Sequence, residues 1–410
     1  MAALSGMRLD SGKCKVNVSA NTQNTGRSLE DESRRALLPA DSDQAVLAGR
    51  LDLGDGPTPV LIRRGMVEDV SAAAPTVSDL LELDDPAGVE GRALFPASTL
   101  ADHAPLLAPV DLQAIKACGV TFAVSAIERV IEEAARGDMA AAAGLRDRLE
   151  ARVGGGIRSV VPGSPEAATL KAALIEDGMW SQYLEVAIGP DAEVFTKTAV
   201  LASVGWGAEI GVRSDSGWNN PEPEILLVTN SSGRIAGAAL GNDVNLRDFE
   251  GRSALLLGKA KDNNASCAIG PFIRLFDDHF TMDDVRSAEI ALTIEGQEGY
   301  RLEGHSSMAQ ISRDPEELVR QARSEHHYPD GFALFLGTLF APVQDRDEPG
   351  RGFTHKVGDL VTISTPKLGT LVNRVTTSDR APAWTFGIGA LMRNLAGRGL
   401  LSAQGSAGDS

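Results

Sequence analysis

The sequence predicts a strand-rich α+β protein with a small N-terminal α/β domain ahead of a larger catalytic domain. Its 410 residues exceed the roughly 100–200 residues of one average domain. It contains 43 glycines and 20 prolines but only 5% aromatic residues, a composition typical of many turns. After about residue 180, short apolar runs alternate with Gly, Pro, Asn and Asp, the pattern of successive short strands.

The first part of the chain predicts an unfolded extension followed by a small folded unit. Residues 1–44 are polar, mixed in charge and without a period of 2 or 3.6, so we expect them to be disordered. In residues 45–71 a Gly-Asp-Gly-Pro turn separates two apolar runs, as in a strand pair. Residues 77–83 have a helical pattern. The predicted units are the extension, an N-terminal domain at 45–115, a catalytic domain at 116–400 and a flexible tail at 401–410.

The catalytic domain is expected to begin with a helix and to continue mainly as sheet. From Lys116 to Gly137 apolar residues recur at intervals of three and four, which predicts a helix ending near Gly137. Later runs predict strands: EVAI (185–188), EILLVTN (224–230), IALTI (290–294), FALFLG (332–337) and LVTIST (360–365).

Charge and composition exclude several classes of partner. The chain has 39 Lys and Arg against 56 Asp and Glu, a net charge of −17 that would repel nucleic acid. No apolar run reaches the length of a membrane span. Three widely separated cysteines without a CxxC pair predict reduced thiols and a cytoplasmic location. Neither nucleic acid nor a membrane is therefore expected as a partner.

The strongest local pattern is a set of acidic residues beside predicted strands. Glu222 and Glu224 are two apart where a strand begins, so both side chains share a face. Two such carboxylates repel unless a cation lies between them, and hard oxygen ligands of this kind suit Mg²⁺, Mn²⁺ or Ca²⁺. Asp243 could supply a third oxygen ligand. The alternatives are a solvated strand face for the glutamates and a capped, charged helix start around Asp243.

Two further segments could supply proton-transfer or anchoring groups. Lys261 lies in GKAKDNNASCAIGPF (258–272), where it could hold an anionic substrate or act as a base if desolvated; the alternative is an exposed basic loop. Ser125 and Glu128 are three apart on the predicted helix, and apolar neighbours could raise the pKa of Glu128. A solvated ion pair is the alternative for Glu128.

The order of these segments resembles the fumarylacetoacetate hydrolase family, whose pattern runs from an Asn-Tyr-x-x-His-x-x-Glu lid helix through Glu-x-Glu and Asn-Asp-x-x-x-Arg-Asp to a Lys segment ending in Gly-Pro. Here Ser125 and Glu128 follow Gly-Val-Thr-Phe, Glu222-Pro-Glu224 is the Glu-x-Glu, and Lys261 lies nine residues before Gly270-Pro271. Asn242-Asp243 with Arg247-Asp248 matches the third element. FLGTLFAPV (335–343), which contains Thr338, resembles the family's Thr-Gly-Thr-Pro segment.

The resemblance implies a mixed β-sandwich roll, one Mg²⁺ or Mn²⁺ per subunit, and a homodimer or homotetramer. Carried over residue by residue, it implies metal ligands (Glu222, Glu224, Asp243), catalytic groups (Glu128, Lys261) and substrate-binding groups (Ser125, Arg247, Ser306, Ser307, Thr338). Which of Glu128 and Lys261 is the base is left open.

Departures from the family pattern bear on the reaction. Ser125 stands where hydrolytic members have the His that activates water, and Glu250 replaces a Gln. A closer similarity is to family dehydratases that convert 2-keto-3-deoxy-D-xylonate or D-arabinonate to 2,5-dioxopentanoate in non-phosphorylative pentose catabolism, a reaction without an attacking water. The alternatives are an acylpyruvate or diketo-sugar-acid hydrolase and a non-catalytic sugar-acid binder.

Overall fold

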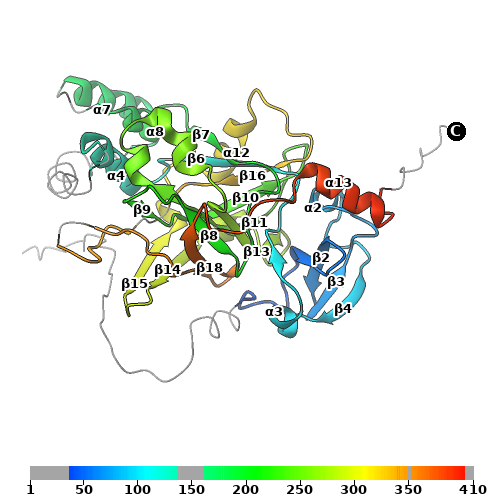
Figure 1. The fold of residues 1–410 in the computed structure, drawn as a ribbon. Coiled ribbons are helices and arrows are strands. Elements are labelled where there is room, and N and C mark those ends of the chain that lie inside the picture. Colours follow the sequence, from blue (N-terminus) through cyan, green and yellow to red (C-terminus); the bar gives the residue numbers. More distant parts are fainter. Residues whose placement is uncertain are drawn as a thin grey trace, which may run out of the picture.

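The structure, a computed structural model, describes residues 37–136, 138, 160–176, 178, 180–338, 340, 342–349 and 352–401. It is a strand-rich α+β fold in which a large mixed sheet packs on a smaller one, with helices around the edges (Figure 1). The predicted fold class is confirmed.

The large sheet joins the N-terminal strands to the central ones. In spatial order its strands are β4 (Arg92–Pro96), β3 (Met66–Asp69), β2 (Pro57–Arg63), β1 (Leu47–Asp52), β13 (Cys267–Leu275), β11 (Ile235–Asp243), β10 (Pro223–Thr229), β16 (Phe332–Phe335), β6 (Ala114–Gly119) and β7 (Glu193–Thr198), while β5 (Leu106–Leu107) pairs with β1. All described pairs are antiparallel except β16 with β6. The pairing of β1 with β13 makes the sheet continuous.

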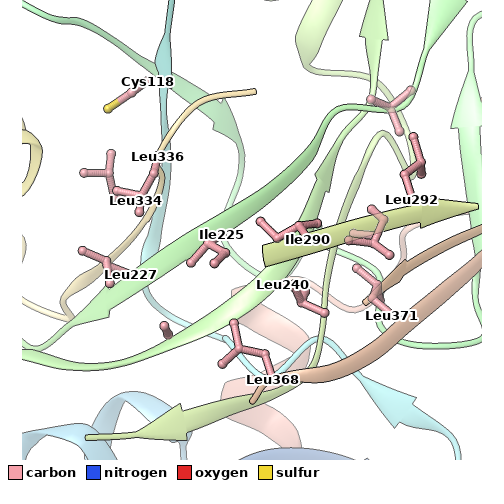
Figure 2. Packing of buried hydrophobic residues seen from close by; sticks show 14 of the residues in the cluster. Cys118, Ile225, Leu227, Leu240, Ile290, Leu292, Leu334, Leu336, Leu368 and Leu371 are labelled. Atoms are coloured by element: carbon pink, nitrogen blue, oxygen red, sulfur yellow. The ribbon is translucent and has the colours of Figure 1, made fainter. Parts of the chain in front are cut away.

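The smaller sheet covers one face of the large sheet. Its strands are β15 (Arg301–Ser307), β14 (Glu289–Glu295), β17 (Leu360–Thr365), β18 (Gly369–Thr377) and β8 (Glu209–Val212), and β9 (Asn219–Asn220) pairs separately with β12 (Asn245–Leu246). Figure 2 shows the core between the sheets, where Ile225 and Leu240 of the large sheet meet Ile290 and Leu371 of the small one. This apolar layer fixes the sheets against each other.

Central strands of the large sheet are buried on both faces. In β10, Ile225 and Leu227 point into the core between the sheets, whereas Leu226 and Val228 join a second core with Leu80 of α2 (Val77–Glu82). This alternation follows from the period of two in a strand. The face that carries Leu226 and Val228 also carries Glu224, the second residue of β10.

Helices at the edges complete the fold. They are η1 (Ala97–Thr99), α3 (Leu100–His103), α4 (Ala123–Ala134), α7 (Pro165–Glu176), α8 (Gln182–Ile188), α9 (Arg247–Glu250), η3 (Ala254–Leu256), α10 (Leu257–Lys261), α11 (Met282–Arg286), η4 (Met308–Gln310), α12 (Pro315–Arg323) and α13 (Ile388–Gly397). In the part of the chain that the structure describes, no helix is both long and apolar enough to span a membrane.

Two predicted elements are wrong in part. The segment 116–119 belongs to strand β6, and helix α4 begins only at Ala123; the predicted end at Gly137 lies outside the described residues. EVAI (185–188) is not a strand but the end of α8, because Ser181 caps a helix whose apolar side packs on α4.

The N-terminal predictions are confirmed for the strand pair, as β1 and β2, and for the helix, as α2. Residues 1–36 of the predicted extension lie outside the described part. Residues 37–44 are ordered rather than disordered, since Leu37 is buried and Asp41 forms an ion pair with Arg274 of β13 at 2.6 Å. The domain boundary near residue 115 remains a prediction.

A buried ion pair beside the smaller sheet should make the free energy of unfolding depend on pH. Arg346 donates two hydrogen bonds to Asp359, at 2.6 and 2.7 Å. Burial alone would raise the pKa of Asp359, but the hydrogen bonds from Arg346 and His355 outweigh it and lower the pKa from 3.8 to about 2. The unfolded chain therefore takes up the proton first as the pH falls.

We expect Asp359 to contribute about 2 kcal/mol to the free energy of unfolding above pH 4, and this contribution to disappear as the pH falls through 2. Urea unfolding of the wild type and Asp359→Asn between pH 6 and 2 measures it. The variant should be less stable near neutral pH and lose less stability on acidification. Equal acid dependence of the two proteins would contradict the assignment.

Candidate metal centre and active site

Three buried carboxylates meet where β10 begins and β11 ends. The two strands are antiparallel, and the Asp243 N–H donates to the Glu222 carbonyl at 3.0 Å, so these residues lie opposite each other. Glu224 lies two residues along β10 on the same face. One carboxylate oxygen from each of the three residues lies within 4.8 Å of the others. The three predicted metal ligands are thus brought together as the Glu-x-Glu spacing indicated.

Glu224 is held by the turn that follows β16. The Gly337 N–H donates to Glu224 Oε2 at 2.8 Å, and the Thr338 hydroxyl donates to Oε1 at 3.2 Å. Gly337 has a φ of 107°, and a Cβ at this position would lie 1.9 Å from the Thr121 hydroxyl oxygen, so only glycine fits this turn.

Two lysines contact the carboxylate trio of Glu222, Glu224 and Asp243. The Lys261 ammonium bridges Glu222 and Asp243, with 2.9 Å to Asp243 Oδ2. Lys197, on β7, approaches the other oxygen of Asp243 at 2.6 Å. Lys261 is the lysine that the sequence predicted, whereas Lys197 was not singled out.

Charged side chains connect helix α4 to the trio through ion pairs. Arg129 donates to Glu222 Oε1 at 2.8 Å and pairs with Glu132 at 2.6 Å and Glu250 at 2.8 Å. Arg247 reaches Glu132 at 3.3 Å. Sequence reasoning missed Arg129 and Glu132 because their partners lie far away in the chain; only their spacing of three, which places them on one helix face, was visible.

The charges in this network leave room for one divalent cation. The described residues of the network comprise six carboxylates and four cations, leaving two negative charges: Glu132, Glu193, Glu222, Glu224, Asp243 and Glu250 against Arg129, Lys197, Arg247 and Lys261. A divalent cation on the trio would balance them. Carboxylate oxygens are also the ligands that Mg²⁺ and Mn²⁺ prefer. Both the donor set and the charge fit such an ion.

The pKa values reflect the same excess of negative charge. Burial, together with the charges of Asp243 and Glu222, raises the pKa of Glu224 well above its usual range. Burial likewise raises the pKa of Glu250 to about 7, although Arg129 opposes it. Burial also favours the neutral form of Glu222, but the nearby Lys261 and Arg129 lower its pKa to about 2. Without a divalent ion, Glu224 is therefore the ligand whose ionised form is most disfavoured.

Glu193 is a further acid beside the trio that sequence reasoning missed. It lies on β7 opposite Gly119 of β6, and a Cβ at Gly119 would come within 2.0 Å of Glu193 Oε2. Burial raises the pKa of Glu193, while the charges of Arg129 and Lys261 oppose this and Glu222 adds to it. A carboxyl group with a raised pKa that is not a metal ligand suits proton transfer.

The predicted lid residues lie on α4. Glu128 is half-buried, whereas its neighbours Arg129 and Glu132 are buried toward the trio. The Ser125 hydroxyl donates to the Thr338 carbonyl at 2.9 Å, which ties α4 to the turn that holds Glu224. Ser125 and Thr338 thus lie together at the edge of the trio, and the roles of Ser125, Thr338 and Glu128 stay predictions.

The other predicted substrate-binding residues lie elsewhere. Arg247 is only 2% exposed and donates to Asn220 at 2.9 Å as well as pairing with Glu132, so its guanidinium is held within the network. Ser306 and Ser307 lie at the end of β15 in the smaller sheet, where the Ser307 hydroxyl accepts the Ala309 N–H at 3.3 Å. Both serines belong to the smaller sheet rather than to the strands that carry the trio, and their role stays a prediction.

Comparison with known proteins establishes the family. Residues 166–376, about half of the chain, match the family model described as fumarylacetoacetate (FAA) hydrolase C-terminal. The chain belongs to the fumarylacetoacetate hydrolase family. The matched region contains the whole carboxylate trio and Lys261, so the resemblance predicted from the sequence is confirmed.

Two curated family members are similar to this chain. One, from Haloferax volcanii, is named probable 2-keto-3-deoxyxylonate dehydratase and is 33% identical over 202 residues, 49% of this chain and 66% of that protein. The other, from Saccharolobus solfataricus, is named 2-dehydro-3-deoxy-D-arabinonate dehydratase and is 33% identical over 186 residues, 45% of this chain and 58% of that protein. The chain thus spans less than two thirds of each relative.

Solved structures share the fold. Apo 2-keto-3-deoxy-D-arabinonate dehydratase aligns with a TM-score of 0.59 at 21% identity, covering 81% of this chain and 99% of that one. The same dehydratase complexed with magnesium and 2,5-dioxopentanoate aligns with a TM-score of 0.58, also at 21% identity and with the same coverage. These likenesses confirm the family fold of the chain.

Proposed function

We propose that this chain is a metal-dependent hydro-lyase that dehydrates a 2-keto-3-deoxy-pentonate, of the D-xylonate or D-arabinonate series, to 2,5-dioxopentanoate. The observation that carries the proposal is the buried trio of Glu222, Glu224 and Asp243 with Lys261 across it, in a chain whose curated relatives are named dehydratases of these sugar acids.

Glu222, Glu224 and Asp243 would hold one Mg²⁺ or Mn²⁺ per subunit. When bound, the cation supplies a Lewis acid that stabilises the negative charge developing on the 2-keto oxygen as C3 loses a proton. The three ligands arrive from two adjacent strands of the central sheet, so their spacing is fixed before substrate binds.

Lys261 serves as a charged group in this proposal. Burial alone would lower its pKa, but the charges of Asp243, Glu222 and Glu250 outweigh it and raise the pKa above the usual lysine range. The side chain therefore stays an ammonium, which can attract the anionic substrate. The hydroxide that develops at C4 is more basic than the amine, so Lys261 can also supply the proton with which the hydroxyl leaves as water. Of the two predicted catalytic residues, Lys261 then fits the acid, and the base is a carboxylate.

Glu193 and Glu128 are the candidates for that base. It takes a proton from C3 while the C4 hydroxyl leaves as water, and proton shifts in the unsaturated keto acid then form the aldehyde at C5. Glu193 is favoured by its raised pKa and by the charges of Lys261 and Glu222 that act on it, whereas Glu128 is half-buried on α4.

We expect Glu193→Gln to lower kcat by roughly 10²–10⁴-fold, the usual contribution of a proton-transfer group, with the affinity for Mn²⁺ unchanged. Glu128→Gln is the matched comparison and should cost less. Steady-state kinetics at saturating Mg²⁺ measures both variants. A larger loss in Glu128→Gln than in Glu193→Gln would assign the base to Glu128 instead.

Dehydration is favoured over hydrolysis by the side chain at position 125. Hydrolysis needs a group that deprotonates an attacking water, and the Ser125 hydroxyl is neither basic nor free, because it donates to the Thr338 carbonyl at 2.9 Å. Elimination of water needs no such group. An acylpyruvate or diketo-sugar-acid hydrolase is therefore the second candidate, on the strength of the shared trio alone.

Mass-resolved product analysis tests the proposal. The protein is incubated with Mg²⁺ and 2-keto-3-deoxy-D-xylonate, 2-keto-3-deoxy-D-arabinonate or an acylpyruvate. We expect one or both sugar acids to lose one water and yield an aldehyde, with the acylpyruvate intact. Cleavage of the acylpyruvate into two acids, with the sugar acids untouched, would replace the dehydratase by the hydrolase. Binding of the sugar acids without any conversion would favour the non-catalytic binder.

The family resemblance also leads us to propose a homodimer or homotetramer located in the cytoplasm, acting on a small 2-keto acid rather than on nucleic acid or a membrane. Light scattering after size-exclusion chromatography measures the assembly, and a monomer at micromolar concentration would contradict it.

A further inference from the structure

Strand β7 contains an irregularity that directs a lysine toward the carboxylate trio. In the pairing of β7 with β6, Ile115 is opposite Thr198 and Lys116 is opposite Thr196, so Lys197 is one extra residue in β7. Such a β-bulge re-aims a side chain and is common next to active sites. The Lys197 side chain is 0% exposed, which is rare for lysine unless it is paired.

The Lys197 ammonium lies among three oxygens. It donates to the Val244 carbonyl at 3.2 Å and to the carbonyl of Lys261, and it forms an ion pair with Asp243 Oδ1 at 2.6 Å. Lys197 thus contacts one metal-ligand candidate and the backbone of the lysine that faces the trio.

Other side chains of β7 face the same place. The Lys261 ammonium lies 5.8 Å from the centre of the Phe195 ring, and the pKa of Glu193 depends on the charge of Lys261. In addition, the Thr198 hydroxyl donates to Asp262 at 2.8 Å, next to the end of α10. Strand β7 therefore contacts both parts of Lys261: Lys197 binds its backbone carbonyl, and Phe195 lies beside its ammonium.

We propose that Lys197 is a positioning residue, which fixes the Asp243 carboxylate for a divalent cation and places Lys261 for the reaction. The inference rests on the proposed function for its link to catalysis. Lys197 holds Asp243 Oδ1, while Oδ2 remains on the side of Lys261 and the other carboxylates. Without Lys197, the Lys261 ammonium can form ion pairs with both oxygens of Asp243 and so occupy the position of the cation. We expect this loss of order to outweigh the gain in cation affinity from the negative charge that removal of Lys197 leaves uncompensated.

The test is Lys197→Met, with Lys116→Met as the matched control. Lys116 lies half-exposed on the paired strand β6, and its ammonium donates to the Thr196 hydroxyl at 3.0 Å. Calorimetric titration with Mn²⁺ measures metal affinity without substrate, and kinetics at saturating Mn²⁺ measures kcat. We expect Lys197→Met to weaken Mn²⁺ binding about 10–100-fold, as loss of an outer-shell partner does, and to lower kcat at saturating Mn²⁺ at least about 10-fold.

A folded Lys197→Met protein, judged by circular dichroism, that binds Mn²⁺ with wild-type affinity and keeps kcat within about twofold would overturn the proposal. If Lys197→Met does not fold, Lys197→Arg is used instead, which keeps the charge but moves the donors. Reduced Mn²⁺ affinity or kcat in Lys197→Arg supports positioning, whereas wild-type values would overturn it. A wild-type protein that binds Mn²⁺ but does not convert the sugar acids would contradict the proposed function, and the Mn²⁺ titration would still test the role of Lys197.

Discussion

Glu224→Gln is expected to abolish Mn²⁺ and Mg²⁺ binding and to lower turnover by about a thousandfold or more, while the metal-free protein stays as stable as the wild type. The loss follows because a Lewis acid contributes several kcal/mol to stabilising the reaction's negative charge. Stability is retained because burial and the charges of Asp243 and Glu222 raise the pKa of Glu224 in the metal-free site, so a neutral glutamine replaces a group whose charge is disfavoured there. A glutamine has nearly the same shape and can still accept from Gly337 or Thr338.

Calorimetric titration with Mn²⁺ and thermal unfolding without metal test both parts of this prediction. Glu289→Gln, at an exposed position of β14, is the matched control and should change neither quantity. Unaltered Mn²⁺ affinity in Glu224→Gln would remove Glu224 from the ligand set. A large loss of metal-free stability would show instead that Glu224 is ionised and stabilising in the absence of metal.

Lys261→Met is expected to lower kcat by roughly 10²–10⁴-fold and yet to leave Mn²⁺ binding as tight as in the wild type or tighter. The ammonium of Lys261 lies between Glu222 and Asp243, so it competes with a cation for their oxygens. Its removal frees those oxygens but takes away the proton donor for the C4 hydroxyl. A variant of a metal ligand loses both Mn²⁺ affinity and kcat, whereas Lys261→Met should lose only kcat. This difference distinguishes the role of Lys261 from that of the three ligands.

The control for Lys261→Met is Lys259→Met, which removes an exposed lysine from the same short helix, α10. Both variants are compared by Mn²⁺ titration and by steady-state kinetics. Loss of Mn²⁺ binding in Lys261→Met would indicate that the lysine organises the ligands rather than taking part in proton transfer. Wild-type kcat in that variant would exclude it from the reaction.

Much of the fold and part of the site could be predicted from local patterns. Strand β10 is an apolar run of the right length between turn residues, and the structure has it at Pro223–Thr229. The Glu-x-Glu spacing placed Glu222 and Glu224 on one face because strand side chains alternate. Asp243 was expected as a third oxygen ligand from its acidic segment and then from the family pattern, and the pairing of β10 with β11 explains why it lies beside Glu222.

The rest of the site depends on contacts that no local pattern records. Arg129, Glu193 and Lys197 reach the trio from α4 and β7, separated from it by tens of residues in sequence, and their neighbours in the chain are unremarkable. The bulge at Lys197 depends on the register between β6 and β7, which a single sequence does not specify. A buried lysine therefore looks the same as a surface lysine until the sheet is known.

The two errors in secondary structure have a common cause. The segment 116–119 carries apolar residues that also fit the helical period of α4, but its backbone pairs with β16 and β7 as strand β6. EVAI (185–188) is short enough to fit either state, and it became helical because it packs on α4. Short apolar segments are ambiguous until their tertiary partners are known.

The central claim is that this chain removes water from a 2-keto-3-deoxy-pentonate with a divalent cation held by Glu222, Glu224 and Asp243. The most direct measurement is turnover of the sugar acid by protein stripped of metal with a chelator and then given back Mg²⁺, with the product identified by mass. We predict that 2,5-dioxopentanoate formation stops on stripping and returns with Mg²⁺. Unchanged turnover by the metal-depleted protein would contradict the account.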